Sequence, residues 1–312
     1  MVEATGGTTS QRSGRLPYPG SCFLCGRSGG PERVAEAGYV GRACVCGTIY
    51  IDPVPEPTAS SPTDDAHLDS YYALPAALRL EWAARFVPSG RFLEVGCGSG
   101  QLIGRALDLG FDAEAVEPNA ACAEWVRRRY GIEVEEALIE ESTLPSGRFD
   151  LIFHVDLLSH FPDPIRALEA MARRLRPGGF MCFEVGLFAG LDPRWYPWVG
   201  RPRFPAHRWF YDEASLEQVL DRAGFELVEI ETFAIAPSTV ISAALRRLLP
   251  AHLEAVPAAP TESDGLPARG SAIHRAYARA HYLLRYRLGA LIAFPGPRTA
   301  FVAARRVEEP SP

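Results

Sequence analysis

The chain has 312 residues, and its 32 lysines and arginines stand against 38 aspartates and glutamates, for a formal net charge of −6. An acidic chain has no general electrostatic attraction to nucleic acid or anionic membranes, so small or neutral partners are favoured and no nucleic acid is expected. No run of about 18 apolar residues occurs, so no membrane-spanning helix is expected. The length allows one large domain with an appendage, or two modest domains.

The first 20 residues are rich in Gly, Ser, Thr and Pro and lack an apolar core. They predict a disordered N-terminus rather than a signal peptide or a helix, and we expect a cytoplasmic protein. In a reducing compartment, the seven cysteines are expected to be thiols or metal ligands rather than disulfides.

Four of the cysteines form two close pairs. Cys22 and Cys25 are followed, after residues 26–43, by Cys44 and Cys46. Four thiolates in two pairs suit tetrahedral zinc, so this part of the chain is predicted to form a small β module that looks like a zinc ribbon. The second pair is spaced by one residue where ribbons normally have two, so one of Cys44 and Cys46 need not be a ligand. Four metal-free cysteines on a small β-hairpin are the alternative.

A glycine-rich stretch carries the main functional signal. An apolar run over residues 91–95 ends in Gly96, Gly98 and Gly100, and an amphipathic segment follows. This pattern predicts a strand, a tight turn and a helix, whose backbone would lie close to a nucleoside-type ligand. A dinucleotide fingerprint requires another glycine at the position of Gln101, and a phosphate-binding loop requires a lysine that is absent. Both phosphate-binding interpretations are therefore disfavoured. An ordinary strand-to-helix turn without a ligand is the remaining alternative.

Glu117 ends the next predicted strand, which covers residues 113–117. A carboxylate at this position can accept hydrogen bonds from both ribose hydroxyls of a nucleoside, and Pro118 and Asn119 start the following helix. A solvated acid at a loop tip is the alternative, but the preceding glycine turn favours the binding role.

Residues 149–155 predict a fourth strand, and ligands of open α/β sheets bind beyond the carboxyl ends of strands. A histidine is the natural base for removing a proton from a hydroxyl or an acidic carbon. His160 is the first catalytic candidate, and His207, in an aromatic loop over residues 187–210, is the second. Asp156 is expected to orient the His160 ring or to help bind a cation. Structural roles for the histidines, and a loop packed on the sheet edge rather than gripping an acceptor, are the alternatives.

Residues 94–100 read Glu-Val-Gly-Cys-Gly-Ser-Gly and resemble the first motif of the class I S-adenosylmethionine-dependent methyltransferases, whose cofactor carries no phosphate. Residues 156–164 resemble the Glu-His-x-x-Asp-Pro segment of members that modify small phenolic or ubiquinone-type acceptors, with His160 at the histidine position. Ser159 stands where that pattern has glutamate. Because some relatives hold a divalent cation here, the use of a cation stays open. A zinc ribbon precedes the catalytic domain in one group of the family, so the resemblance covers the chain from about residue 20 onward.

The resemblance implies that S-adenosylmethionine is the cofactor and that the glycine turn and neighbouring strand tips bind it. In the family a tyrosine ahead of the turn often covers the cofactor, and an acid or small residue after the third strand lies near the adenine. No aspartate follows that strand in this chain, so only backbone groups are candidates there. The predicted cofactor-binding residues are Glu94, Gly96, Cys97, Gly98, Gly100, Glu117, Pro118, Asn119, Ala137, Leu138 and Tyr72.

The resemblance also implies an α/β fold: a seven-stranded Rossmann-like sheet with helices on both faces, over residues 89–312. We expect it to follow the zinc-ribbon-like module of residues 21–53 and a linker with a cofactor-covering helix over residues 54–88. The seventh strand is expected at residues 299–307. It comes after an insertion at about 237–298 that includes a basic amphipathic helix, which would pack on its own domain, contact a membrane or an anionic partner, or cover the acceptor.

The predicted function is methyl transfer from S-adenosylmethionine to an oxygen, or an acidic carbon, of a small-molecule acceptor, with a structural zinc in the ribbon. One alternative is an RNA or protein methyltransferase that uses the ribbon to bind its substrate. The acidic charge and the lack of a basic, aromatic-interleaved ribbon argue against it. The other alternative is a non-catalytic subunit that only binds the cofactor.

Overall fold

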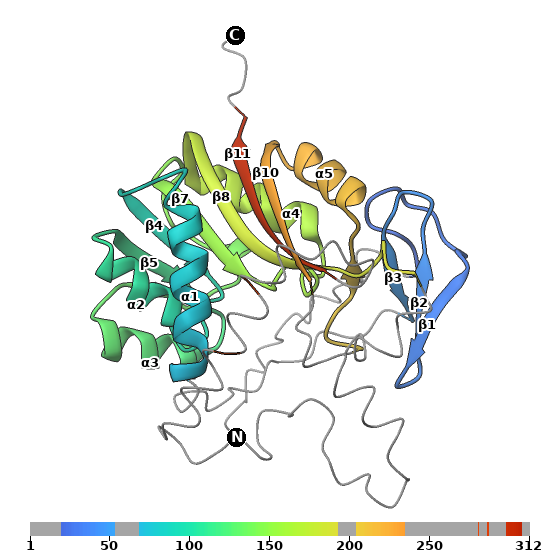
Figure 1. Ribbon diagram of the computed structural model, residues 1–312, viewed down its shortest axis with the longest axis horizontal. Helices are drawn as coiled ribbons and strands as arrows, with labels where there is room; N and C mark the ends of the chain where they lie inside the picture. Colours follow the sequence, from blue (N-terminus) through green and yellow to red (C-terminus); the bar gives the residue numbers. More distant parts are fainter. Residues whose placement is uncertain are drawn as a thin grey trace, which may run out of the picture.

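Two β-sheets make up the framework of the chain in the computed structural model, a large one covered by helices and a small one at its side (Figure 1). The predicted disordered N-terminus and almost all of the predicted insertion lie outside the described residues. The described residues are 20–53, 69–192, 204–234, 280, 286 and 298–307.

The larger sheet has seven strands in the order β10-β11-β8-β7-β4-β5-β6. Strands β6, β5, β4, β7 and β8 pair in parallel, and β11 is inserted antiparallel between β8 and β10. This arrangement confirms the predicted seven-stranded Rossmann-like sheet, with the last strand of the chain as an inner strand. The bounds are β4 (Arg91–Val95), β5 (Asp112–Val116), β6 (Val134–Glu135), β7 (Phe149–Val155), β8 (Leu175–Leu187), β10 (Phe225–Ala234) and β11 (Arg298–Arg306).

Helices cover both faces of this sheet (Figure 1). Helices α1, α2 and α3 pack on one face, where Leu80, Ile103 and Phe301 belong to one buried core. Helices α4 and α5 pack on the other, where Leu168 and Leu220 belong to a second core. No helix among the described residues is both long and apolar enough to cross a membrane. The bounds are α1 (Asp69–Ala83), α2 (Gln101–Asp108), α3 (Ala120–Tyr130), η2 (Ile139–Glu141), α4 (Pro164–Arg174) and α5 (Glu213–Arg222).

Three of the helices begin at a polar side chain that accepts a hydrogen bond from an otherwise unpaired backbone N–H. Asn119 Oδ1 accepts from the N–H of Ala121 at 3.0 Å at the start of α3. Asp163 and Asp212 cap α4 and α5 in the same way, at 3.1 Å and 2.8 Å. Each cap contributes about 1 kcal/mol to helix stability and fixes where the preceding loop ends.

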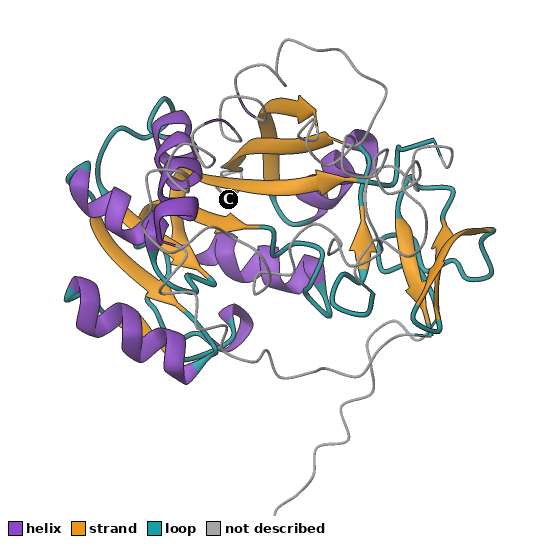
Figure 2. Cartoon of the chain, turned by 60° about the horizontal axis from the view of Figure 1, so that its bottom comes forward, coloured by secondary structure: helices purple, strands orange, loops and turns teal. Residues whose placement is uncertain are grey.

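The small sheet has the order β1-β2-β3-β9 and is antiparallel throughout. Its strands are β1 (Glu32–Glu36), β2 (Tyr39–Ala43), β3 (Ile49–Asp52) and β9 (Trp209–Phe210). Strand β9 follows β8 in the chain, so a segment of the large domain completes the N-terminal module. Figure 2 shows this sheet beside the end of the large one.

This pairing corrects only the ends of the aromatic loop predicted over residues 187–210. Strand β8 continues to Leu187, and β9 pairs Trp209 with Tyr50 and Phe210 with Ile49. Trp209 and Phe210 are both buried, because one packs toward the large-domain core and the other belongs to the core of the small sheet. The described aromatics of this segment therefore pack within the protein.

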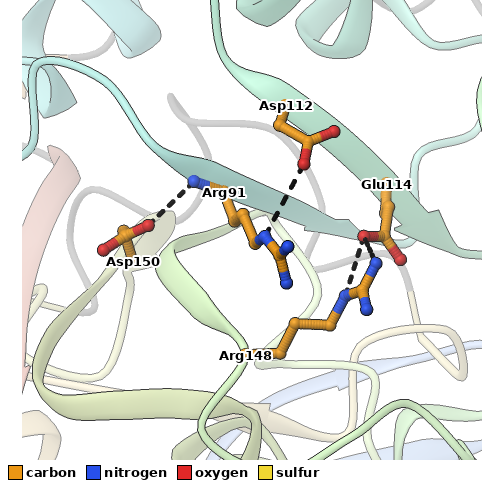
Figure 3. A network of polar contacts seen from close by, with 5 residues as sticks. All are labelled: Arg91, Asp112, Glu114, Arg148 and Asp150. Carbon is orange, nitrogen blue, oxygen red and sulfur yellow. Dashed lines mark hydrogen bonds and ion pairs between the residues drawn. The ribbon is translucent and has the colours of Figure 1, made fainter.

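Charged side chains join three strands at their amino ends (Figure 3). The backbone N–H of Arg91 donates to Asp150 Oδ2 at 2.8 Å, and the Arg91 Nε lies 3.7 Å from Asp112 Oδ2. Nearby, Arg148 Nε donates to Glu114 Oε1 at 2.9 Å. Partly exposed pairs of this kind each contribute about 0–1 kcal/mol. They tie β4, β5 and β7 together at the edge opposite the carboxyl ends of the strands.

Candidate active site

The turn after β4 has the backbone shape that only glycine adopts without strain. Gly96, Gly98 and Gly100 have φ values of 69°, 51° and 80°. The N–H of Gly96 donates to the carbonyl of Val116 at 2.8 Å, which ties the turn to the end of β5. A left-handed backbone at three alternate positions explains the spacing seen in the sequence.

The surroundings of the glycines differ. A Cβ on Gly100 would lie 2.7 Å from the Tyr130 ring and 2.9 Å from a methyl of Val126, so α2 and α3 pack closely there. A Cβ on Gly96 would lie 2.5 Å from Leu157 Cδ1, which brings the segment after β7 against the turn. A Cβ on Gly98 would meet no atom within 4 Å among the described residues. Gly98 is therefore the glycine whose backbone a ligand can approach.

Glu117 holds this turn in place. Its side chain is buried, with Oε2 accepting from the N–H of Gly98 at 3.0 Å and Oε1 accepting from the N–H of Asn119 at 2.9 Å. Hydrogen bonds to an ionised carboxylate are stronger than neutral ones. One carboxylate thus connects the glycine turn to the start of α3, and its remaining lone pairs can still accept from a ligand.

Glu94, at the carboxyl end of β4, is a second buried acid at the turn. Its Oε2 has no hydrogen-bond partner among the described residues. Burial raises the pKa of Glu94 well above its ordinary value, although the nearby Arg79 guanidinium acts in the opposite direction. Arg79 itself donates to Glu184 Oε2 at 2.6 Å. A buried carboxylate oxygen without a partner suits a cationic ligand group.

The other predicted cofactor-binding residues lie around the same edge. Cys97 is buried, Pro118 is exposed, and Asn119 caps α3. Ala137 and Leu138 follow β6, whose Glu135 carbonyl accepts from the N–H of Glu117 at 2.9 Å. Tyr72 belongs to α1, but its side chain lies outside the described residues.

The segment after β7 carries a strained residue. Asp156 has a φ of 53°, and its N–H donates to the carbonyl of Glu184 at 2.9 Å. A non-glycine residue in the left-handed region costs about 1–3 kcal/mol, and such residues concentrate at functional sites. The strain occurs where the sequence predicted a pocket-lining residue.

Two histidines that are far apart in the sequence meet beside Asp156. The rings of His160 and His207 lie 4.4 Å apart between centroids, and the His207 Nδ1 is 3.0 Å from the Ser159 Oγ. One ligand atom each from Asp156, His160 and His207 lies within 4.8 Å of the others. The group can accept and pass on a proton, and the same three side chains are able to bind a divalent cation. Ser159 occupies the position where the resembled pattern has glutamate.

The four N-terminal cysteines also gather in space. The sulfurs of Cys22 and Cys46 lie 3.5 Å apart, those of Cys25 and Cys44 lie 3.2 Å apart, and all four lie within 4.8 Å of one another. Burial raises the pKa of Cys22, and that of Cys44 more strongly. The one-residue spacing of the second pair does not keep Cys44 or Cys46 away from the cluster.

A family profile described as methyltransferase domain matches residues 66–230, more than half of the chain. The chain belongs to this methyltransferase family. The match includes the glycine turn, Glu117 and the Asp156–Ser159–His160 segment, and it confirms the predicted class I, S-adenosylmethionine-dependent family.

Curated relatives of this methyltransferase match over part of their length. The ubiquinone biosynthesis O-methyltransferase of Bordetella avium (strain 197N) is 30% identical over 147 residues, which cover 39% of this chain and 61% of the relative. The protein of the same name from Alkalilimnicola ehrlichii is 31% identical over 118 residues, covering 35% and 47%. The chain thus spans about half of the length of these relatives. A solved candidate methyltransferase from Bacillus halodurans C-125 aligns with a TM-score of 0.50 at 17% identity, covering 74% of this chain and all but 1% of its own, and supports the fold alone.

The buried groups at the turn fit the cofactor of this methyltransferase family. S-adenosylmethionine carries an ammonium group, a sulfonium and a ribose with two hydroxyls. Among the described residues, Glu94 Oε2 has no partner and suits a cation, and no atom comes within 4 Å of a Cβ on Gly98, which suits close approach. The spare lone pairs of Glu117 suit hydroxyls.

Three residues that the sequence interpretation did not assign contact the histidine segment. Ser159 touches His207, and the side chains of Trp209 and Tyr211 donate to backbone carbonyls of Phe161 and Leu158 at 2.8 Å and 3.1 Å. Trp209 and Tyr211 are two residues apart, which is the period of a strand. That alternation was the available signal for β9.

We expect Gly100→Ala to destabilise the methyltransferase more than Gly98→Ala does. Both substitutions place alanine at positive φ, at a cost of about 1–2 kcal/mol. Only Gly100→Ala also forces a methyl group against Tyr130 and Val126, adding about 1–3 kcal/mol. Urea unfolding of the two variants measures the difference. Equal losses would show that α3 moves away from the turn without cost.

Proposed function

We propose that this methyltransferase transfers a methyl group from S-adenosylmethionine to a hydroxyl oxygen, or an acidic carbon, of a small-molecule acceptor. The observation that carries the proposal is that His207 meets His160, which lies on the segment whose Leu157 abuts the glycine turn. A base therefore stands next to the cofactor loop. The relatives named ubiquinone biosynthesis O-methyltransferase support oxygen as the acceptor atom.

The residues around the glycine turn form the cofactor half of the site, and their role is to bind and orient S-adenosylmethionine. Glu117 would accept from the ribose hydroxyls while it holds Gly98, and Glu94 would interact with a cationic group of the cofactor. When bound, S-adenosylmethionine supplies an electrophilic methyl group. Its transfer relieves a positive charge, so positioning of the two reactants provides most of the rate enhancement. The backbones of Ala137 and Leu138 would border the adenine of a bound cofactor.

The acceptor half of the site moves the proton. His160 takes the proton from the acceptor hydroxyl or carbon acid as that atom attacks the methyl group. Its neighbour His207, held by the Ser159 hydroxyl at 3.0 Å, passes the proton onward. We assign the orientation of the His160 ring to Asp156, which has a carboxylate oxygen within 4.8 Å of a His160 ring nitrogen.

A second role for the same residues is cation binding. Asp156, His160 and His207 offer a carboxylate and two imidazoles within 4.8 Å, and a divalent cation there would lower the pKa of a bound acceptor hydroxyl. The two roles differ in their response to added metal. Activity that is unchanged by Mg²⁺, Mn²⁺ or EDTA favours the base, and activity restored only by a cation favours the metal.

Zinc is the structural metal that we propose for the cysteine cluster. Four thiolates at mutual distances below 4.8 Å fit a tetrahedral Cys₄ site. The ribbon then stabilises the fold, since its Cys22 and Phe23 belong to the core on the α4 and α5 face. The alternative of a ribbon that binds RNA or protein is less consistent with the net charge of −6 and with this inward packing.

We expect S-adenosylmethionine to bind with a dissociation constant of about 1–100 µM and NAD not to bind, as measured by calorimetry. Glu117→Ala should weaken binding by at least about 1–2 kcal/mol, because the ribose loses its acceptor. Glu124→Ala removes an exposed acid from the neighbouring helix α3 and is the matched control. Since Glu117 also holds the turn, the unfolding free energy of each variant is measured in parallel. An unchanged affinity in Glu117→Ala would remove the assignment.

We expect methyl transfer to a small molecule. Purified protein with labelled cofactor is incubated with a panel of phenols and catechols and with the small-molecule, RNA and protein fractions of a source extract. Label should enter a small molecule, and His160→Gln should lower kcat by about 10²–10⁴-fold with cofactor affinity unchanged. Label in RNA or protein alone would favour the macromolecular alternative. Binding without transfer to any fraction would favour a non-catalytic subunit.

We expect about one zinc per chain by elemental analysis of the purified protein. Cys22→Ser should lose the metal, whereas Cys122→Ser, on α3 and outside the cluster, should retain it. Because burial raises the pKa values of Cys22 and Cys44, zinc binding must displace protons, and zinc affinity should rise with pH. A folded protein without zinc that ignores added zinc would contradict the Cys₄ assignment.

A further inference from the structure

One short segment of the chain contacts both the cysteine module and the histidine site. Strand β9 pairs with β3 through Trp209 opposite Tyr50 and Phe210 opposite Ile49, and the carbonyl of Arg208 accepts from the N–H of Ile51 at 3.1 Å. His207 directly precedes these residues. The histidine is therefore attached to the edge of the small sheet.

The same segment holds the backbone on both sides of His160. The N–H of Arg208 donates to the carbonyl of Ser159 at 2.7 Å. Trp209 Nε1 donates to the carbonyl of Phe161 at 2.8 Å, and the Tyr211 hydroxyl donates to that of Leu158 at 3.1 Å. Three hydrogen bonds from one segment thus fix the turn that carries His160.

The loop between Cys22 and Cys25 packs against this segment through Phe23. Phe23, between Cys22 and Cys25, is buried, and its ring lies 4.8 Å from that of Trp209 and 6.2 Å from that of Tyr211, edge-on in both cases. The next residue, Leu24, accepts a hydrogen bond at its carbonyl from Arg222 of α5. The inner side of the cysteine loop is packed against the two side chains that hold the His160 turn.

We propose that the cysteine loop positions the histidine pair, and that Phe23 is the positioning residue which acts through Trp209 and Tyr211. The inference rests on the proposed role of the histidines. Rings packed edge to face transmit a displacement because a well-packed core does not deform freely. A metal bound by the flanking cysteines would hold the Phe23 ring against Trp209. Since a misplacement of about 1 Å can cost about 10²-fold in rate, this contact affects turnover without touching the cofactor.

The test compares Phe23→Ala with Val45→Ala. Val45 lies between Cys44 and Cys46 and is 78% exposed. Its truncation therefore removes an apolar side chain next to the same cysteines without affecting the packing of Trp209. The main readout is the long-range ¹H–¹⁵N spectrum of the imidazoles, assigned with His160→Gln and His207→Gln. This readout needs no acceptor. Zinc content and cofactor affinity are measured for each variant.

In Phe23→Ala, we expect the His160 and His207 resonances to move. The chemical shift of His207 Nδ1 should change because its hydrogen bond to Ser159 is lost. Cofactor affinity should stay within about twofold, and kcat should fall at least about tenfold where an acceptor is in hand. Val45→Ala should match the wild type in every measurement. Phe23→Leu keeps an apolar side chain and should show a smaller change in the same direction. It replaces Phe23→Ala should that variant fail to fold.

Histidine resonances at wild-type positions in folded Phe23 variants would overturn the proposal. A loss of cofactor affinity equal to the loss of kcat would also overturn it, because the contact would then act on the fold as a whole. Shifted resonances in a protein that transfers no methyl group would keep the positioning role and reject the proposed function. The two claims therefore fail separately.

Discussion

The site depends on a carboxylate shared by two backbone amides. Glu117 accepts from Gly98 and Asn119, and so fixes the glycine turn and the start of α3 relative to each other. The turn has positive φ at three alternate residues and would otherwise lack a fixed shape. Because the carboxylate is buried, each of these hydrogen bonds is stronger than it would be in water. The glycine turn and the start of α3 are therefore held together by groups of the protein itself.

The acceptor edge is built differently, from two parts of the chain that have no regular structure of their own. Asp156 and His160 follow β7 in a strained turn, while His207 precedes a strand of only two residues. Neither element is stable alone, since short strands gain stability only by pairing and packing with the rest of the fold. Their geometry comes from Trp209 and Tyr211, which reach the backbone of the turn. The geometry of the histidine segment thus comes from tertiary packing.

The sequence predicted what local chemistry determines. The glycine spacing predicted the turn, the acid at the next strand tip predicted Glu117 as a site residue, and the four cysteines predicted a cluster that the structure gathers. The sheet followed from the family resemblance and is confirmed. The roles of the individual site residues remain predictions, which the binding and transfer experiments address.

Strand β9 could not be predicted with the same means. It covers Trp209 and Phe210 alone, and its partner β3 lies about 160 residues earlier in the chain. The alternation of Trp209 and Tyr211 is a single pair, which is too short to distinguish a strand from a loop whose aromatic residues bind a ligand. The contact between Ser159 and His207 was hidden for the same reason, because it joins residues that only the fold brings together.

The pairing of β3 with β9 has a consequence for biosynthesis. The cysteine module is the first described part of the chain to leave the ribosome, yet its fourth strand is made about 160 residues later. Until then the Phe23 ring lacks its edge-on contact with Trp209. Contacts this distant in sequence also form slowly, because loop closure must precede them. During synthesis, the edge of β3 therefore stays unpaired until β9 is made, and the small sheet is completed only by a strand of the large domain.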